Sequence, residues 1–320
     1  MIGKNQDYWP PLPVAEWQGT RDTLHMCTQI AGKVRLMLSP KINHWWQVPF
    51  YVTPRGLSTS AIPYQSGIFE IQFDFTEHRV TVLTSAGDVK TIALTARPVA
   101  EFYDEFMGAL RSLGIGVKIW TLPCEVPNAI HFDEDRVHSE YDREYANRFW
   151  RALVSTHTIF TEFRARFLGK CSPVHFFWGS FDLAVTRFSG RRAPERPGAD
   201  SITREAYSHE VISAGFWPGT GETDATFYAY AAPEPQGFSK ASVVPAPTFY
   251  SAQLSEFLLP YEDVRNASSP RDMLLDFLQS SYEAGATLGN WDRKEIERVP
   301  PPARSPGSTG TGKQAISASE

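Results

Sequence analysis

The sequence predicts an α+β fold, in which largely antiparallel sheets pack with three or four helices. Helical and extended patterns come in separate runs, whereas a parallel sheet would alternate them strictly. The 320 residues include 13% aromatic side chains and 24 prolines, which favour strands and loops over a helix bundle. Hydrophobic residues make up 42% and charged residues 21%, so the chain can build an ordinary globular core.

Apolar residues at helical spacing predict the main helices. Residues that start or stop helices mark their ends. Pro40 follows the first helix, Gly114 follows the second, and Gly169 closes the third. Ser269 as N-cap and Pro270 at the first helical position begin the last one. The predicted helices cover residues 23–38, 98–113, about 142–168, and a final segment from 270 onward.

Alternating apolar residues predict strands in two separate regions. The stretch 69–75 places four apolar side chains on one face. Ala86-Gly87-Asp88 between two such stretches predicts a hairpin turn. The predicted strands lie within 45–94, at 117–120, and at about 174–188, 210–217 and 225–232.

Composition along the chain predicts one globular unit with two extensions. Residues 1–15 are rich in proline and are expected to form a surface arm, and 16–300 form the globular unit. The order helix, strands, helix occurs twice. This suggests the hypothesis of an internal duplication with halves 16–125 and 126–300, although no residue-level repeat accompanies it. The Pro/Ser/Gly/Thr-rich tail 301–320 is expected to be disordered.

Charge and cysteine usage argue against several classes of protein. The net charge of −5 does not favour nucleic-acid binding, which needs concentrated Lys and Arg. No apolar run reaches the ~18 residues of a membrane span, and the N-terminus lacks the apolar core of a signal peptide. Cys27, Cys124 and Cys171 are odd in number and widely spaced, so we expect a reducing, cytoplasmic location. The oligomeric state stays open.

The tail contains a near match to a phosphate-binding loop, from Gly307 to Gln314. That motif needs a preceding strand, a following helix, and a Ser or Thr hydroxyl where Gln314 stands. We therefore expect no nucleotide there, and the sequence names no other cofactor.

The densest group of candidate site residues lies between His175 and Glu210. Taken as one strand, residues 174–188 have a core face, which includes His175 and Arg187, and a mixed face typical of a cavity wall. The mixed face carries Trp178, Ser180, Asp182, Ala184 and Thr186. His175 and Asp182 then share a face only if Gly179 interrupts the alternation.

A catalytic hypothesis joins this strand to the segment EAYSHE, where a histidine and a carboxylate are adjacent. One carboxylate would orient a histidine base, and an arginine would hold substrate charge. The same ionisable groups, without the arginine, could instead bind a metal. The structural alternatives are a buried salt bridge at Asp182 and solvated polar residues at the start of a strand. The candidate catalytic residues are His175, Asp182, Arg187, His209 and Glu210.

A second set of residues mixes aromatic, amide and basic side chains and predicts ligand contacts. A helix face and the segments NHWW and TPRG contribute to it. Paired indoles beside histidine and arginine suit an organic ligand with a negative charge, although each Trp alone also suits core packing. The candidate ligand-binding residues are His25, Gln29, His44, Trp45, Arg55, Trp178, Ser180 and Arg191.

The strings NHWW, HFFWGSFDLAVTRFSGR, EAYSHE and GFWPG occur together in this order. With these motifs the chain, from Trp17 to about Lys294, resembles an uncharacterised bacterial family, a domain of unknown function. The resemblance implies one continuous unit with the tail outside it, and it implies no activity.

Two functions therefore stay open at this stage. The first is an enzyme acting on a small polar or anionic organic molecule in an aromatic-lined pocket. The alternative is a non-enzymatic module that binds a small ligand. An enzyme requires the candidate acid, base and arginine to converge within hydrogen-bond reach, whereas a binding module requires only the cavity.

Overall fold

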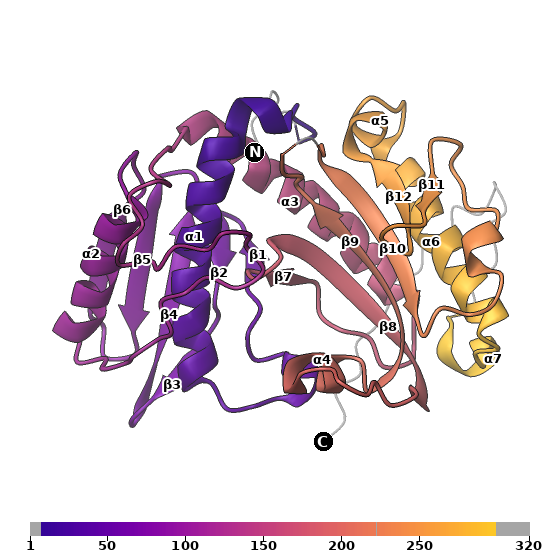
Figure 1. The fold of residues 1–320 in the computed structure, drawn as a ribbon, viewed down its shortest axis with the longest axis horizontal. Coiled ribbons are helices and arrows are strands. Elements are labelled where there is room, and N and C mark those ends of the chain that lie inside the picture. The colour runs from indigo at the N-terminus through magenta and orange to yellow at the C-terminus, as the bar shows by residue number, and fades with distance from the viewer. Residues whose placement is uncertain (1–7, 222, 299–320) are drawn as a thin grey trace, which may run out of the picture.

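Two antiparallel six-stranded sheets lie side by side in the computed structural model, which describes residues 8–221 and 223–298 (Figure 1). The first sheet has the order β1-β2-β4-β5-β6, and β3 also pairs with β4. Its strands are β1 (Tyr51–Thr53), β2 (Gly56–Ser58), β3 (Ile62–Tyr64), β4 (Gly67–Asp74), β5 (Arg79–Thr84) and β6 (Val89–Ala93).

The second sheet has the order β11-β12-β10-β9-β8-β7 and forms the other half of the molecule. Every strand pair in it is antiparallel. Its strands are β7 (His175–Phe177), β8 (Asp182–Arg192), β9 (His209–Trp217), β10 (Thr226–Ala232), β11 (Phe249–Ser251) and β12 (Glu256–Pro260).

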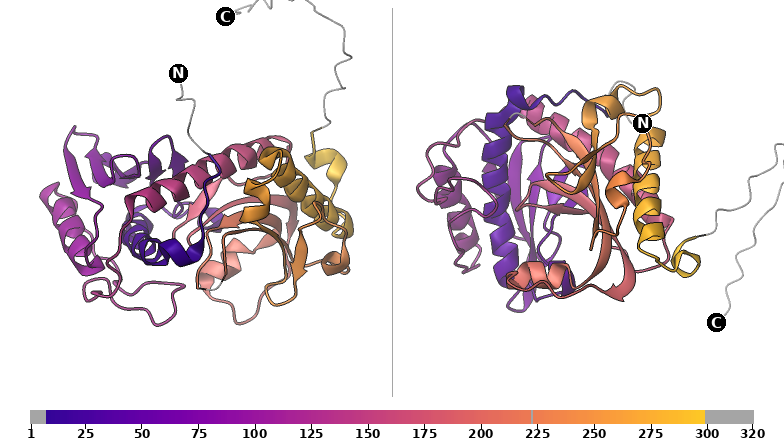
Figure 2. Two further views of the ribbon diagram at one scale, coloured as in Figure 1. Left: turned by 90° about the horizontal axis from the view of Figure 1, so that it is seen from above. Right: turned by 45° about the vertical axis from the view of Figure 1, so that its right-hand side comes forward.

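Helices cover one face of each sheet. In Figure 1, α1 crosses the front of the first sheet, and α2 packs at its edge against β6. The long helix α3 runs behind both sheets, and α6 packs behind β9 and β10 (Figure 2). The helices are α1 (Val14–Leu38), α2 (Val99–Ser112), α3 (Arg143–Ala165), α4 (Ser201–Ala206), α5 (Tyr261–Arg265), α6 (Pro270–Leu288) and α7 (Arg293–Ile296), with 3₁₀ turns η1 (Asn43–Trp45) and η2 (Phe238–Lys240).

A backbone bridge between Phe50 and Phe176 joins the two sheets. Phe50 and Phe176 exchange two N–H···O hydrogen bonds of 2.8 Å each. Behind this bridge the ring of Phe149 on α3 stacks on Phe181, with centroids 5.1 Å apart. The second sheet thus has its back buried on α3 and α6, while its front face turns toward α1 and η1.

The predicted α+β class with antiparallel sheets is confirmed, and so are most element positions. Ser269 caps α6 by accepting a hydrogen bond from the Asp272 N–H, as its sequence predicts. The first helix is longer than predicted, because Val14 and Trp17 are buried and continue its apolar face toward the N-terminus. The predicted strand at 117–120 is wrong, since those residues are irregular. The sequence prediction also missed β11 and β12.

The segment 174–188 is a hairpin and not one strand. β7 ends at Phe177, β8 begins at Asp182, and the Phe181 N–H donates to the Phe177 carbonyl at 2.8 Å. Phe181 adopts φ 62°, which reverses the chain. Because directly paired residues of a hairpin project to the same side, His175, opposite Ala184, shares a face with Asp182.

The tail and its near phosphate-binding loop lie outside the described residues. Of the predicted arm, residues 8–13 pass over the middle of α3 and the start of α5: Ser155 donates to the Tyr8 carbonyl at 2.6 Å, and Tyr261 donates to the Pro10 carbonyl at 2.9 Å. Residues 51–93 supply all strands of the first sheet and 175–260 those of the second.

Candidate functional site

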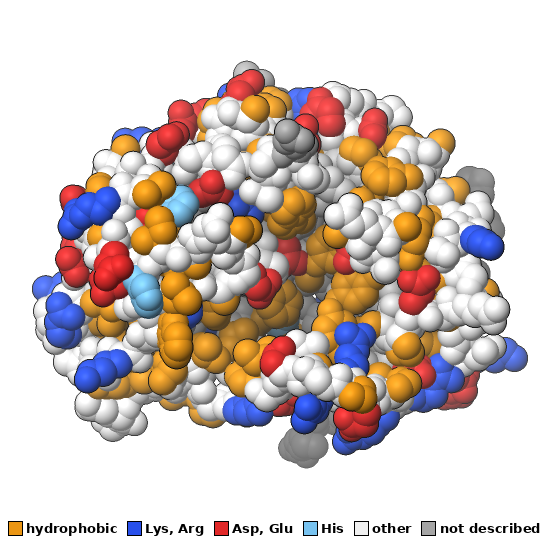
Figure 3. Space-filling view, in the orientation of Figure 1, with side chains coloured by type: hydrophobic (Ala, Val, Ile, Leu, Met, Phe, Trp, Pro, Cys, Tyr) orange, Lys and Arg blue, Asp and Glu red, His pale blue; other side chains and the backbone are white. Residues whose placement is uncertain are grey.

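A cavity of about 690 Å³ opens on the front face of the second sheet. In Figure 3 it is the central hollow, with hydrophobic side chains along its floor and acidic side chains inside it. Strands β8, β9, β10 and β12 form the floor, and the end of α1, the segment 44–48, residues 124–125 and α4 form the walls. This volume falls within the ~300–1,000 Å³ of ordinary small-molecule sites.

Small side chains in the middle of the sheet make room for the cavity. Ala184 and Ser213 lie in its floor, with Gly215 beside them on β9. A Cβ atom added to Gly215 would lie 2.2 Å from the ring of Tyr228. The glycine therefore lets the tyrosine lie flat across β9, so that its hydroxyl reaches Asp182 on β8.

Aromatic rings form most of the cavity wall. Trp178 shows how they are held: its indole N–H donates to the Val48 carbonyl at 2.9 Å, and its ring packs on Gly32, where a Cβ atom would lie 2.3 Å from it. The aromatic lining residues are Trp45, Trp46, Phe177, Trp178, Phe188, Tyr207, Trp217, Tyr228 and Tyr230.

Asp182 is the most buried carboxyl group of the cavity, with 6% of its surface exposed. Ser180 donates a hydrogen bond of 2.5 Å to Oδ1, and Tyr228 donates one to Oδ2. Burial raises the pKa of Asp182 above its ordinary value, although both hydroxyl groups oppose the shift. The salt bridge considered for Asp182 is wrong, because its partners are two neutral hydroxyl groups.

Glu125 and Glu256 bring two more carboxyl groups to the lining. Neither makes a side-chain hydrogen bond or ion pair with the described part of the chain. Burial, and then the nearby Asp182 carboxylate, raises the pKa of Glu256 to about 7. The same two causes raise the pKa of Glu125. No Lys or Arg is among the described residues that line this cavity.

Basic groups gather behind one end of the cavity wall. Lys170 Nζ lies 2.6 Å from His44 Nε2 and over the rings of Trp46 and Phe188. The other ring nitrogen of His44, Nδ1, lies 3.2 Å from the Glu205 carbonyl oxygen on α4. Burial, and then the Lys170 charge, lowers the pKa of His44. This contact ties α4 to η1 and closes the lower side of the cavity.

Several of the predicted site residues lie on the cavity wall. Asp182 and Ser180 come from the hairpin with Trp178, and they meet His44 and Trp45 from η1 across the cavity. Their roles in catalysis or binding stay predictions. The mixed face predicted from sequence, including Ala184 and Thr186, is the face that lines the floor.

Arg187 does not belong to the cavity. It is on the back of β8, 1% exposed, with its guanidinium carbon 3.5 Å from the ring centroid of Phe163 and 4.3 Å from that of Tyr282. It also donates a hydrogen bond to the Phe163 carbonyl. Burial lowers its pKa to about 10. Arg187 is a core residue between α3 and α6, so it cannot hold substrate charge.

His209 and Glu210 lie far from Asp182. Leu183 pairs with Phe216, and the course of β9 from Phe216 back to His209, at ~3.3 Å per residue, spans roughly 20 Å. Glu210 forms an ion pair of 2.7 Å with Arg191, whose guanidinium also donates to the Gly289 and Asn290 carbonyls after α6. These contacts fix the end of β8 and the start of β9 to the end of α6. The predicted catalytic set therefore does not converge.

The side chains on the predicted face of α1 form hydrogen bonds with neighbouring loops and do not line the cavity. Gln29 donates to the Cys124 carbonyl at 2.8 Å and accepts from the Cys124 N–H at 2.9 Å, which fixes the loop that carries Glu125. His25 Nε2 lies 2.8 Å from the Gly179 carbonyl oxygen at the hairpin turn. Arg55 is outside the site as well, in an ion pair of 2.7 Å with Asp74.

A family model described as a family of unknown function, DUF5996, matches residues 9–298. The chain belongs to this family. The match confirms the resemblance and covers both sheets and all the helices named above. No curated protein and no solved structure matches the chain.

In this DUF5996 chain one histidine, His175, lies directly behind the cavity wall. His175 is 1% exposed, and its ring packs edge-on against Trp46, Tyr51 and Phe177. Neither ring nitrogen has a hydrogen-bond partner among the residues that the structure describes. Burial, and then the charge of Arg35, lowers the pKa of His175 to about 3. The ring is therefore neutral at neutral pH and packs among aromatic side chains, and its predicted catalytic role stays a prediction.

Replacing His175 by phenylalanine should stabilise the protein at acid pH. The unfolded chain protonates His175 below pH 6.5 and the folded chain only near pH 3, so the wild-type histidine costs stability as the pH falls through this window. The difference in free energy of unfolding between variant and wild type should grow by about 2 kcal/mol from pH 8 to pH 5. Urea unfolding at both pH values measures it, and a pH-independent difference would contradict it.

The sequence prediction missed Tyr228, Tyr230, Glu256 and Glu125. The two tyrosines alternate with Phe227 and Ala229 along β10, and this period of two was a usable signal. Glu256 begins a strand of five residues, too short to be recognised. Glu125 lies in an irregular segment with no pattern.

Among the described residues there is no group of three or more His, Cys, Asp or Glu side chains that could hold a metal ion. The predicted metal-binding residues do not come together, because His209 and Glu210 lie far from Asp182.

The described helices include none with the length and the apolar composition of a membrane span.

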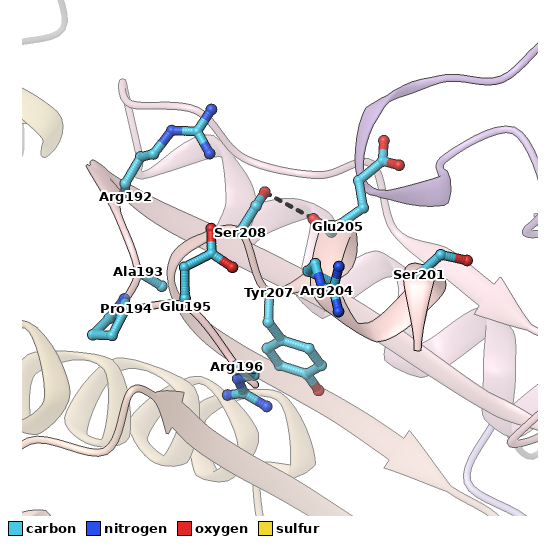
Figure 4. Close-up of a pocket in the computed structure, with 10 residues that line it drawn as sticks. All are labelled: Arg192, Ala193, Pro194, Glu195, Arg196, Ser201, Arg204, Glu205, Tyr207 and Ser208. Atoms are coloured by element: carbon cyan, nitrogen blue, oxygen red, sulfur yellow. Dashed lines mark hydrogen bonds between the residues drawn. The ribbon is translucent and has the colours of Figure 1, made fainter. Parts of the chain in front are cut away.

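A second, smaller pocket of about 310 Å³ lies on the outer side of α4 (Figure 4). Arg192, Arg196 and Arg204 line it together with Glu195 and Glu205, so its charges are mixed. The Arg196 guanidinium lies 4.2 Å from the ring centroid of Tyr207, and this ring also lines the large cavity. Tyr207 thus forms the partition between the two pockets.

Proposed function

We propose that this protein binds a small organic molecule in the cavity on the front of the second sheet and exerts its function there. The observation that carries the proposal is the cavity itself: about 690 Å³, walled by aromatic rings, with a few carboxyl and hydroxyl groups. Such a surface is costly to expose to water without a ligand to cover it. The small residues of the floor, Ala184 and Ser213, leave this space open.

Two variants that fill the cavity from different strands test the proposal. Ala184→Phe on β8 and Leu258→Trp on β12 both place a larger side chain in the lining. A thermal-shift screen of neutral, anionic and cationic small molecules should find compounds that raise the Tm of the wild type by several degrees. These compounds should lose their effect in both variants. Because four Trp residues line the cavity, binding should also change the intrinsic fluorescence.

The proposal fails if no compound stabilises the wild type, or if the hits stabilise both filled variants equally. A variant that does not fold is recognised by its circular dichroism, and the other variant then decides. Glu134→Gln, at an exposed position outside the cavity, serves as a control that should bind like the wild type.

An enzyme is the second candidate, and one observation favours it. The pKa of Glu256 is raised to about 7, beside Asp182 in the same cavity, and a carboxyl group with such a pKa can donate and accept protons at neutral pH. Each hit should therefore be incubated with the protein and followed by NMR. Turnover that Glu256→Gln abolishes without loss of binding would establish the enzyme, whereas unchanged hits leave a binding module.

A further inference from the structure

Two carboxyl groups of the cavity lack donors among the described residues, because many hydroxyl groups of the lining are already hydrogen-bonded elsewhere. Both hydroxyl groups next to Asp182, from Ser180 and Tyr228, already donate to it. Along the floor two pairs of hydroxyl groups bind each other: Thr186 with Ser213 at 2.9 Å, and Tyr207 with Tyr230 at 3.0 Å. The carboxyl oxygens of Glu125 and Glu256 have no such partners in the described chain. These carboxyl groups therefore favour a ligand that brings hydrogen-bond donors or positive charge.

The carboxyl groups of the cavity differ from other partly buried acids of this protein. Asp74 pairs with Arg55 at 2.7 Å, and Glu162 pairs with Arg271 at 2.6 Å. Asp182, Glu125 and Glu256 come from β8, a loop and β12, and no Lys or Arg joins them in the lining. A buried carboxylate without a cation is costly. Two hydroxyl groups offset part of this cost at Asp182, whereas the half-buried Glu256 and the more exposed Glu125 have no such partner among the described residues.

Aromatic rings line the cavity beside the carboxyl groups and can also attract a cation. Indole and phenol rings attract cations through the negative face of their π systems, and this attraction reaches about 2 kcal/mol or more in a desolvated site. Trp178 and Tyr228 line the cavity together with the carboxyl groups. We infer that the ligand of this cavity is an organic cation, a protonated amine or a quaternary ammonium group, held by Asp182, Glu125 and Glu256 among aromatic rings. The inference rests on the proposed function.

The charge state of the cavity agrees with this. Burial, and then repulsion by the Asp182 carboxylate, raise the pKa of both Glu256 and Glu125, so a bound cation would lower these pKa values and release protons. Binding of a cation should therefore tighten as the pH rises from 5 to 8.

Four probes that share a phenyl ring and differ in charge test this inference. Benzylammonium and benzyltrimethylammonium are cations, benzyl alcohol is neutral, and benzoate is an anion. At pH 8 and low salt, titration followed by Trp fluorescence should give the two cations at least 10-fold lower Kd values than benzyl alcohol, and benzoate should not bind. Glu256→Gln should weaken benzylammonium about 10-fold and change benzyl alcohol less than 2-fold. Glu134→Gln should change neither.

The results separate this inference from the proposed function. If benzyl alcohol or benzoate binds as tightly as benzylammonium, and Ala184→Phe and Leu258→Trp abolish that binding, the cavity is a ligand site and the cation is overturned. If benzylammonium binds but the filled variants bind it equally, both proposals fail. Binding of benzylammonium without benzyltrimethylammonium supports the cation and assigns it to the protonated amines. If none of the four probes binds, the inference is overturned, while the broader screen still decides the proposed function.

Discussion

Replacing Arg187 by alanine should lower the free energy of unfolding by about 3–5 kcal/mol, the range of large truncations in a core. The side chain is buried between Phe163 and Tyr282, and its guanidinium donates to the Phe163 carbonyl. Alanine would leave a cavity between α3 and α6 and remove that donor. Urea unfolding at pH 7 with unchanged m measures the loss.

Arg187→Met is the matched control, because it keeps most of the volume while removing the charge. Arg187 has no ion pair in the described part of the chain, so an apolar side chain of similar size should cost less than about 2 kcal/mol. Both variants should bind benzylammonium like the wild type, since Arg187 faces away from the cavity. If a stable Arg187→Met protein lost binding, Arg187 would contribute to the site, which would contradict this prediction.

The sequence predicted the long elements well because each carries several turns or alternations of apolar residues. It failed at the hairpin 175–188 for a local reason. Residues on both sides of the turn favour strands, and only Gly179 interrupts them, while the turn itself depends on Phe181 in a left-handed conformation. This conformation is rare for a bulky residue, so no pattern predicts it. The error placed His175 on the wrong face of the sheet.

The candidate site was only partly predictable for a different reason. Alternation along β8 identified the face with Asp182 and Ala184, because that information is local. Tyr228 and Glu256 join Asp182 in the cavity from β10 and β12, which the fold brings to the same sheet face through the strand order. Charge type alone misled the prediction for Arg187, since a buried arginine in the core and one in a site look alike in sequence.

Replacing Glu256 by glutamine should stabilise the free protein at pH 8. The folded-state pKa of about 7 lies above the ordinary value of 4.5, so the folded protein holds a proton that the unfolded chain has lost between these pH values. The stability that Glu256 contributes is thus present below pH 4.5 and lost as the pH rises through 7. We expect the variant to match the wild type near pH 4.5 and to exceed it by about 1–2 kcal/mol at pH 8, after allowance for solvent in the cavity.

Urea unfolding at both pH values measures this difference, and Glu134→Gln should show none of it. A gain at pH 4.5 equal to that at pH 8 would contradict the role of ionisation. Saturating benzylammonium should reverse the order at pH 8, because the bound cation stabilises the wild-type carboxylate and not the amide. A carboxyl group that weakens the empty protein and strengthens the loaded one is a property of a binding site, and no such reversal is expected of a structural acid such as Glu162, which is already paired with Arg271.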